Sequence, residues 1–79
     1  MSNLRIGKMR REKKQLSVLG ERIRDLRKQN EYSQEKLAEL AEIHVNHVRR
    51  VELGQVNPTY LVLVRIAEAL GVTVQQLLP

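Results

Sequence analysis

Hydrophobic residues recur along this chain at intervals of three and four, the spacing that gives an α-helix one apolar side. In the first run of this kind, charged and polar residues separate Leu19, Ile23 and Leu26. The run begins near Ser17, and Asn30 interrupts it. This pattern predicts an amphipathic helix over residues 17–30.

Two shorter runs follow, separated by Glu42 and Ile43. Ser33 is suited to cap the first run, because its hydroxyl can accept a free backbone N–H. The second run begins near His44 and ends at Gly54, a residue favoured just after a helix. The small apolar residues on the inner sides of the two runs are Leu37, Ala38, Ala41, Val48 and Val51. Two short helices joined by a tight turn, with Ile43 filling that turn, predict a helix-turn-helix motif.

A fourth helix is expected over residues 58–70. Asn57 followed by Pro58 is typical of an N-cap and the first helical position, and Gly71 is suited to end the helix. The β-branched residues within 60–64 could also form a strand. The spacing of the later apolar positions favours a helix; these are Ile66, Ala67 and Leu70.

A short fifth helix closes the chain. Thr73 and Gln76 have the spacing of a capping box, in which each side chain bonds the backbone of the other residue. The helix is expected to continue through Leu78. The whole pattern predicts an all-α domain of five helices, with the helix-turn-helix formed by the second and third.

The positive charge of the chain is concentrated at its start. The protein has 79 residues and a formal net charge of +5. Residues 1–16 hold six basic residues and one acid, 6 − 1 = +5, whereas residues 17–79 hold eight of each sign. We interpret residues 1–16 as a mobile basic arm and residues 17–79 as the folded domain. Such an arm favours a polyanionic partner; the alternative is a solubilising leader without a partner.

Composition excludes several classes of protein. The chain has no cysteine, so no disulfide and no thiolate metal site is possible. It has no apolar run of the ~18 residues needed to span a membrane, and we expect a cytoplasmic protein. No nucleophile–base set, metal-ligand cluster or phosphate-binding loop is visible. A helical domain of this size also leaves no room for an ordinary ligand pocket. We therefore expect no enzyme, no cofactor and no small-molecule substrate.

The predicted third helix, over about residues 44–53, carries side chains suited to reading DNA. Asn46 can pair with adenine, and Arg49 or Arg50 with guanine, through two hydrogen bonds each. His44 and His47 could hold a metal only with a third ligand, but no cysteine lies nearby and Glu42 belongs to the predicted turn. We therefore expect them to contact the DNA groove. The plainer alternative for this surface is an ordinary solvated face.

Several segments resemble the Cro/repressor (XRE) helix-turn-helix family, which has the lambda-repressor-like fold. They are residues 19–27, Ser33-Gln34-Glu35, Leu37-Ala38, Val48, Val51-Glu52-Leu53-Gly54, Asn57-Pro58 and residues 66–72. Within the family, the chain is similar to small phage repressors and restriction–modification controller proteins. A bacterial or phage-encoded regulator is thus implied.

The resemblance also implies roles for particular residues. Gln34 matches a position that contacts phosphate and braces the recognition helix. Val45, Asn46 and Arg50 match positions that touch base edges. Arg27 and Glu52 match a buried ion pair between the first and third helices. From such relatives, the basic arm is expected to reach DNA through Arg5, Lys8, Arg10, Arg11, Lys13 and Lys14.

Two residues depart from the family pattern. Glu42 occupies a turn position that is usually glycine, and a left-handed backbone there would cost roughly 1 kcal/mol. Val45 stands where relatives often place arginine or glutamine. A valine can contact a thymine methyl but cannot make a bidentate hydrogen bond. The base preference of a relative therefore does not transfer to this chain.

Apolar residues near the end of the chain suggest a dimer. We expect a twofold interface formed by Tyr60, Leu61, Val62, Val74, Leu77 and Leu78. The alternative is that some of these residues complete a small core. A dimer would bind a near-palindromic operator, with a recognition helix of each copy in the major groove. The sequence thus predicts a sequence-specific regulator that binds double-stranded DNA. The alternative is an antitoxin-like or adaptor module that has lost sequence reading.

Overall fold

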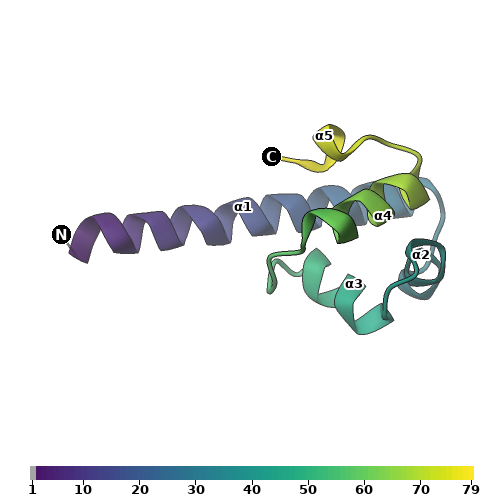
Figure 1. The fold of residues 1–79 in the computed structure, drawn as a ribbon, viewed down its shortest axis with the longest axis horizontal. Coiled ribbons are helices and arrows are strands. Elements are labelled where there is room, and N and C mark those ends of the chain that lie inside the picture. Colours follow the sequence, from purple (N-terminus) through teal and green to yellow (C-terminus); the bar gives the residue numbers. More distant parts are fainter. Residues whose placement is uncertain (1) are drawn as a thin grey trace.

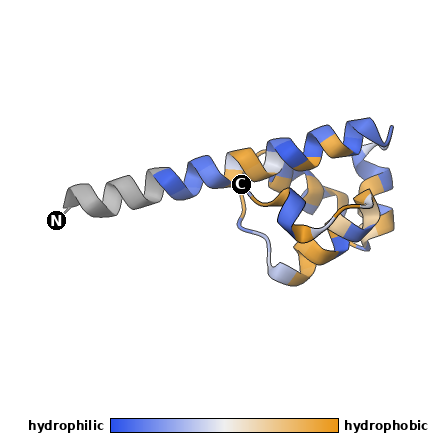
Figure 2. Cartoon of the chain, turned by 90° about the horizontal axis from the view of Figure 1, so that it is seen from above, coloured by the Kyte–Doolittle hydropathy of each residue, from blue (hydrophilic) through white to orange (hydrophobic). Residues whose placement is uncertain are grey.

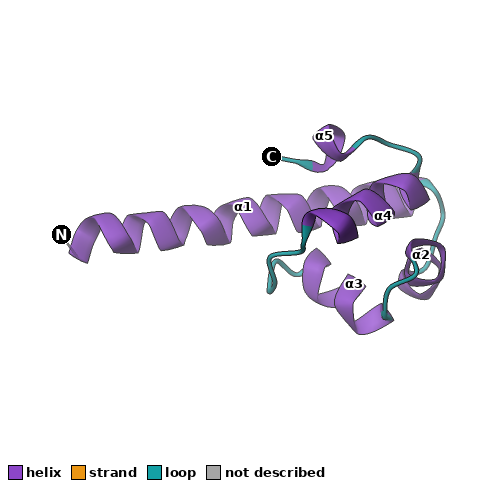
Figure 3. Cartoon of the chain, in the orientation of Figure 1, coloured by secondary structure: helices purple, strands orange, loops and turns teal. Residues whose placement is uncertain are grey.

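The computed structural model describes the backbone of residues 2–79 and the side chains of residues 11–79. Within that part of the chain, five helices joined by short turns form the fold, and there is no strand (Figures 1 and 3). They are α1 (Ser2–Gln29), α2 (Gln34–Ala41), α3 (Val45–Glu52), α4 (Tyr60–Leu70) and α5 (Val74–Leu77). The predicted all-α architecture of five helices is confirmed. None of the described helices is both long enough and apolar enough to cross a membrane.

The first helix is much longer than predicted. It begins at Ser2 rather than near Ser17, and it extends as a rod beyond the other four helices (Figure 1). The described side chains 11–15 are exposed and belong to the hydrophilic stretch of Figure 2. The predicted start was wrong because it was based on hydrophobic spacing, and an exposed stretch of helix needs no apolar stripe. Once packing fixes the later turns, adding residues with good helix propensity requires no new nucleation.

Local capping follows the sequence closely at α2 and α5. The Ser33 hydroxyl accepts the Lys36 backbone N–H at 3.0 Å, as predicted. Thr73 and Gln76 form both halves of the predicted capping box. In that box the Gln76 side chain accepts the Thr73 N–H at 2.8 Å, and the Thr73 hydroxyl accepts the Gln76 N–H at 3.3 Å.

The start of α4 differs from the prediction. Thr59, and not Asn57, is the N-cap, and its hydroxyl accepts the Val62 N–H at 3.3 Å. A residue that precedes proline is biased toward extended backbone, and Pro58 is buried in the loop instead of opening the helix. The predicted end is confirmed, because Gly71 caps α4 with a φ of 73°.

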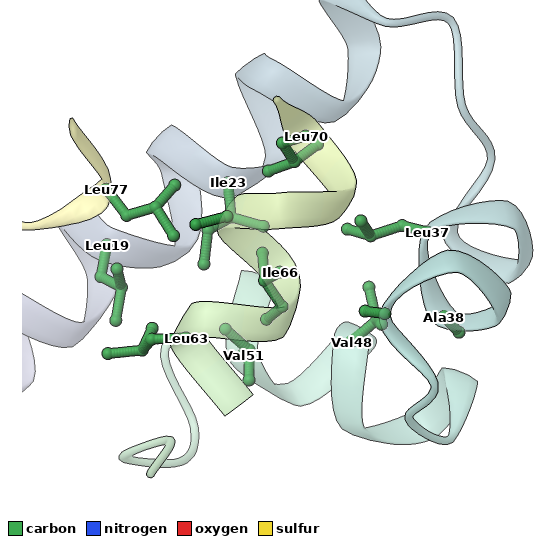
Figure 4. Close-up of a cluster of buried hydrophobic side chains, with 12 residues drawn as sticks. Leu19, Ile23, Leu37, Ala38, Val48, Val51, Leu63, Ile66, Leu70 and Leu77 are labelled. Atoms are coloured by element: carbon green, nitrogen blue, oxygen red, sulfur yellow. The ribbon is translucent and has the colours of Figure 1, made fainter. Parts of the chain in front are cut away.

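One hydrophobic core joins the helices (Figure 4). Ile23 of α1, Val48 of α3 and Ile66 of α4 have no exposed surface. Leu77 of α5 is also completely buried, so its predicted place in a dimer interface is wrong. The short α5 packs against α1 and α4, and Leu77 lies in the core with Leu19 and Ile23 of α1 (Figure 4). Arg22 of α1 donates to the Leu78 carbonyl and holds the C-terminal end against the helix.

Helices α1 and α3 touch at Gly20. A Cβ atom at this position would lie 2.4 Å from the Glu52 carbonyl oxygen and 2.5 Å from that of Val51. Both atoms belong to the backbone and cannot rotate away. The close approach of the two helices therefore requires glycine.

An ion pair beside this contact fixes α1 to α3. Arg27 Nε lies 2.7 Å from Glu52 Oε2, and Arg27 Nη2 lies 3.0 Å from Oε1. Gln34, the first residue of α2, donates its side-chain N–H to the same Oε1 at 3.0 Å. Arg27 also donates to the Tyr32 carbonyl at 2.9 Å, in the turn that leads to α2. One carboxylate thus links three helices.

Burial makes this linkage costly to break. The Arg27 and Glu52 side chains are only 11% and 3% exposed. The hydrogen bond to Glu52 raises the pKa of Arg27 above its ordinary value, although burial alone would lower it. Arg27 is consequently charged wherever the protein is folded.

Gly20→Ala should lower the free energy of unfolding by about 1–3 kcal/mol or more, because the new methyl group forces α1 and α3 apart. Gly71→Ala is the matched control. Its φ is also unfavourable for alanine, but no atom lies within 4 Å of the added Cβ, so about 1–2 kcal/mol is expected. Urea unfolding of both variants measures the difference. An equal or smaller effect for Gly20→Ala would contradict the close approach of the two helices.

Arg27→Ala should cost about 3–5 kcal/mol, since it leaves the Glu52 carboxylate buried without its cation. Arg24→Ala, which removes an exposed arginine from the same helix, should change stability by less than about 0.5 kcal/mol. The double variant Arg27→Met/Glu52→Leu should recover most of the stability, because no buried charge remains. If the double variant is as unstable as Arg27→Ala in urea unfolding, poorer packing rather than charge is the cause.

Candidate DNA interface

The turn between α2 and α3 has the geometry that the sequence suggested. Glu42 has φ 57° and ψ 43°, in the left-handed region, at a cost of about 1–2 kcal/mol for a residue with a Cβ. Its N–H donates to the Glu39 carbonyl at 3.2 Å, and the Ile43 N–H donates to that of Ala38 at 3.0 Å. Ile43 is half-buried against the core. The turn therefore fixes the direction in which α3 leaves α2.

Helix α3 has one buried and one exposed side. Val48, Val51 and Glu52 face the interior, which orients the helix with little freedom. Asn46, Arg49 and Arg50, together with the capping residue His44, are exposed. Val45 and His47 are half-buried, and Val45 packs partly against the core. Hydrogen-bonding and cationic groups therefore cover a surface whose support is rigid.

His44 caps the recognition helix. Its Nδ1 accepts the Asn46 backbone N–H at 3.0 Å. An accepting Nδ1 carries no proton, so a neutral His44 has its proton on Nε2. In this capping state the exposed imidazole has an N–H donor on Nε2 for a base edge or a phosphate.

Asn46 and Arg49 are joined on the exposed side. Arg49 Nη1 donates to Asn46 Oδ1 at 2.7 Å, and Arg49 Nη2 lies 3.5 Å from Glu35 Oε1. The pair with Glu35 is long, and its side chains are 45% and 68% exposed, so it contributes little. The bond within α3 occupies one lone pair of the Asn46 carbonyl. The exposed surface formed by Asn46 and Arg49 therefore offers mainly hydrogen-bond donors, which are the N–H groups of the Asn46 amide and of the Arg49 guanidinium.

The brace role implied for Gln34 is visible in its bond to Glu52. The side chain is half-buried at the start of α2, beside α3. Its contact with phosphate remains a prediction.

Two basic residues that the sequence did not single out lie close to this surface. Arg24 and Lys28 of α1 line a recess with Gln34 of α2 and Arg49 of α3. Their spacing of four residues places them on one side of α1, which was a usable signal. Only the packing of α1 on α3 shows that this side adjoins the recognition helix.

The predicted arm contacts lie apart from the α2–α3 motif. Arg11, Lys13 and Lys14 are exposed on the rod-like part of α1. The side chains of Arg5, Lys8 and Arg10 are outside the described residues. Any joint contact of these groups and α3 would require a ligand long enough to reach both.

Apart from the buried Leu77, the predicted dimer residues divide into two groups. Tyr60, Leu61 and Leu78 are 72%, 58% and 43% exposed. Val62 and Val74 are half-buried against the core. Leu78 also lines a recess of about 320 Å³, whose other apolar lining residues are Leu16, Leu19, Leu63 and Pro79.

Comparison with known proteins gives consistent matches. A sequence profile of the helix-turn-helix family matches residues 23–77. The control protein C.SmaI of Serratia marcescens is 38% identical over 61 residues, which are 77% of this chain and 73% of that protein.

Two crystal structures share the fold at more than 30% identity. The restriction-modification controller protein C.AhdI from Aeromonas hydrophila has a TM-score of 0.77 and 35% identity, and the match covers 78% of this chain and 94% of that one. The hypothetical transcription factor NHTF from Neisseria has a TM-score of 0.80 and 32% identity, covering 86% and 78%. This chain belongs to the helix-turn-helix family of the Cro/repressor (XRE) type, a family of DNA-binding transcription regulators rather than of enzymes.

Proposed function

We propose that the protein is a transcription regulator that binds a specific sequence of double-stranded DNA. The observation that carries this proposal is the exposed side of α3, where Asn46, Arg49 and Arg50 stand on a helix fixed by the buried Arg27–Glu52 pair. A rigid support favours specificity, because little side-chain or helix ordering remains to oppose binding. The controller proteins among its relatives support the same function.

In this proposal α3 enters the major groove with its N-terminal end deepest. Arg50 donates two hydrogen bonds to a guanine, and Asn46 and Arg49 act as a bonded unit beside it. Val45 contributes at most an apolar contact with a thymine methyl. Gln34 and the cations of residues 1–16 contact phosphates, which sets register and adds affinity at every sequence. The protein acts in the cytoplasm of a bacterial cell.

The proposed assembly is a homodimer that binds a near-palindromic operator. Tyr60 and Leu61 at the start of α4 and Leu78 near the C-terminal end are large apolar side chains left exposed, and Leu78 also lines the recess with Leu16 and Leu19. A twofold axis through this end would place an exposed leucine of each copy against the recess of the other. Two recognition helices would then meet the DNA about one helical turn apart.

Selection of bound duplexes from a random pool should enrich a site with twofold symmetry. Arg50→Ala should weaken binding to that site by roughly 5- to 150-fold, corresponding to about 1–3 kcal/mol, and relax preference at one position in each half. Arg65→Ala removes the same charge from an exposed position on α4 and should keep the preference. A pool without enrichment would instead favour the antitoxin-like or adaptor alternative.

Leu61→Glu should convert the dimer to a monomer at micromolar concentration, because it places a carboxylate in the apolar interface. Sedimentation equilibrium measures the change. The matched control is Leu40→Glu, at a leucine that is 43% exposed on α2, and it should remain dimeric. A wild-type protein that sediments as a monomer would disprove the dimer.

A further inference from the structure

A basic recess lies between α1 and α3, next to the proposed reading surface. It has a volume of about 360 Å³ and is lined by Arg24, Arg27, Lys28, Gln34, Arg49, Glu52 and Leu53. A water molecule takes up ~30 Å³ in the liquid, so the recess can hold a partly hydrated phosphate group. Its residues come from three helices that the core holds in fixed positions.

The single carboxylate in the recess is already neutralised. Both oxygens of Glu52 accept hydrogen bonds, from Arg27 Nε and Nη2 and from Gln34 Nε2, at 2.7–3.0 Å. Arg27 and Glu52 together contribute no net charge. The surplus is the positive charge of Arg24, Lys28 and Arg49.

Arg24 and Lys28 form no ion pair within the described part of the chain. No carboxylate there lies within ion-pair distance of either side chain. The two cations stand four residues apart on one helix, where like charges repel. Arg49 adds a third cation, and its only described acidic neighbour, Glu35, lies at 3.5 Å. An anion in the recess would relieve the repulsion of all three.

We propose that this recess binds a phosphate of the DNA backbone, held by Arg24 and Lys28 from α1 and by Arg49 from α3. The assignment rests on the proposed DNA binding, and it adds α1 to the surfaces that contact DNA. Arg49 borders both the recess and the exposed side of α3, so the bound phosphate flanks the bases that α3 reads. The recess fixes the position of α3 along the duplex and does not itself distinguish bases.

The test uses the full chain and a duplex of random sequence, with binding followed by fluorescence anisotropy from about 50 to 200 mM salt. Removing one cation that neutralises a phosphate should reduce the slope of log K against log salt by about 0.9. Because the three cations share a single phosphate, the double variant Arg24→Ala/Lys28→Ala should have a slope smaller by about 0.9. Over this fourfold change in salt, losing this one phosphate contact makes the fall in affinity about 3.5-fold smaller. Arg65→Ala should keep the wild-type slope.

The outcomes separate this site from the proposed function. An unchanged slope in the double variant overturns the recess, even if the wild type enriches a specific site from a random pool. A reduced slope in a protein that enriches no site supports the recess and contradicts sequence-specific regulation. An equal reduction in Arg65→Ala also overturns the recess, because net charge alone would then explain the effect.

A second measurement distinguishes DNA phosphate from a free phosphate ligand. Inorganic pyrophosphate is titrated into the wild type and the double variant, and backbone amide shifts are followed by NMR. Saturable binding by the wild type alone, together with an unchanged DNA salt slope, would assign the recess to a small anion and overturn the DNA assignment. Melting temperatures of the variants within a few degrees of wild type show that the fold is intact.

Discussion

The carboxylate of Glu52 is where three helices of this small domain are joined. Arg27 from α1 and Gln34 from α2 both donate to it, at 2.7–3.0 Å. A buried carboxylate without partners is strongly unfavourable. Moving these helices apart would break its hydrogen bonds and would therefore destabilise the fold. Gly20 allows the backbones of α1 and α3 to approach closely enough for the pair to form. The orientation of the recognition helix thus depends on a polar contact as much as on the core.

On α3, this arrangement separates the buried side that supports the helix from the exposed side that we propose reads DNA. Val48 and Val51 are buried beside Glu52, whereas Asn46 and Arg50 are exposed. Substitutions on the exposed side are therefore expected to have little effect on stability. The left-handed Glu42 and the cap formed by His44 hold the first turn of α3 in place.

Charge is distributed differently in sequence and in space. Residues 17–79 have no net charge, yet Arg24, Lys28 and Arg49 gather at one recess while Glu52 is neutralised by its partners. The remaining positive charge belongs to residues 1–16, and residues 2–16 form the first part of α1. A neutral folded body can therefore still present a cationic surface on one side.

The sequence alone determined the features that depend on near neighbours. Hydrophobic spacing located the two helices of the motif, and Ser33, Thr73 and Gly71 marked helix ends, because caps bond residues only a few positions away. Tertiary structure decided the burial of Leu77 and the meeting of Arg24 with Arg49. Leucine can serve a core or an interface, and a basic residue on α1 can face solvent or α3. Only the packing of helices far apart in the sequence chooses between these positions.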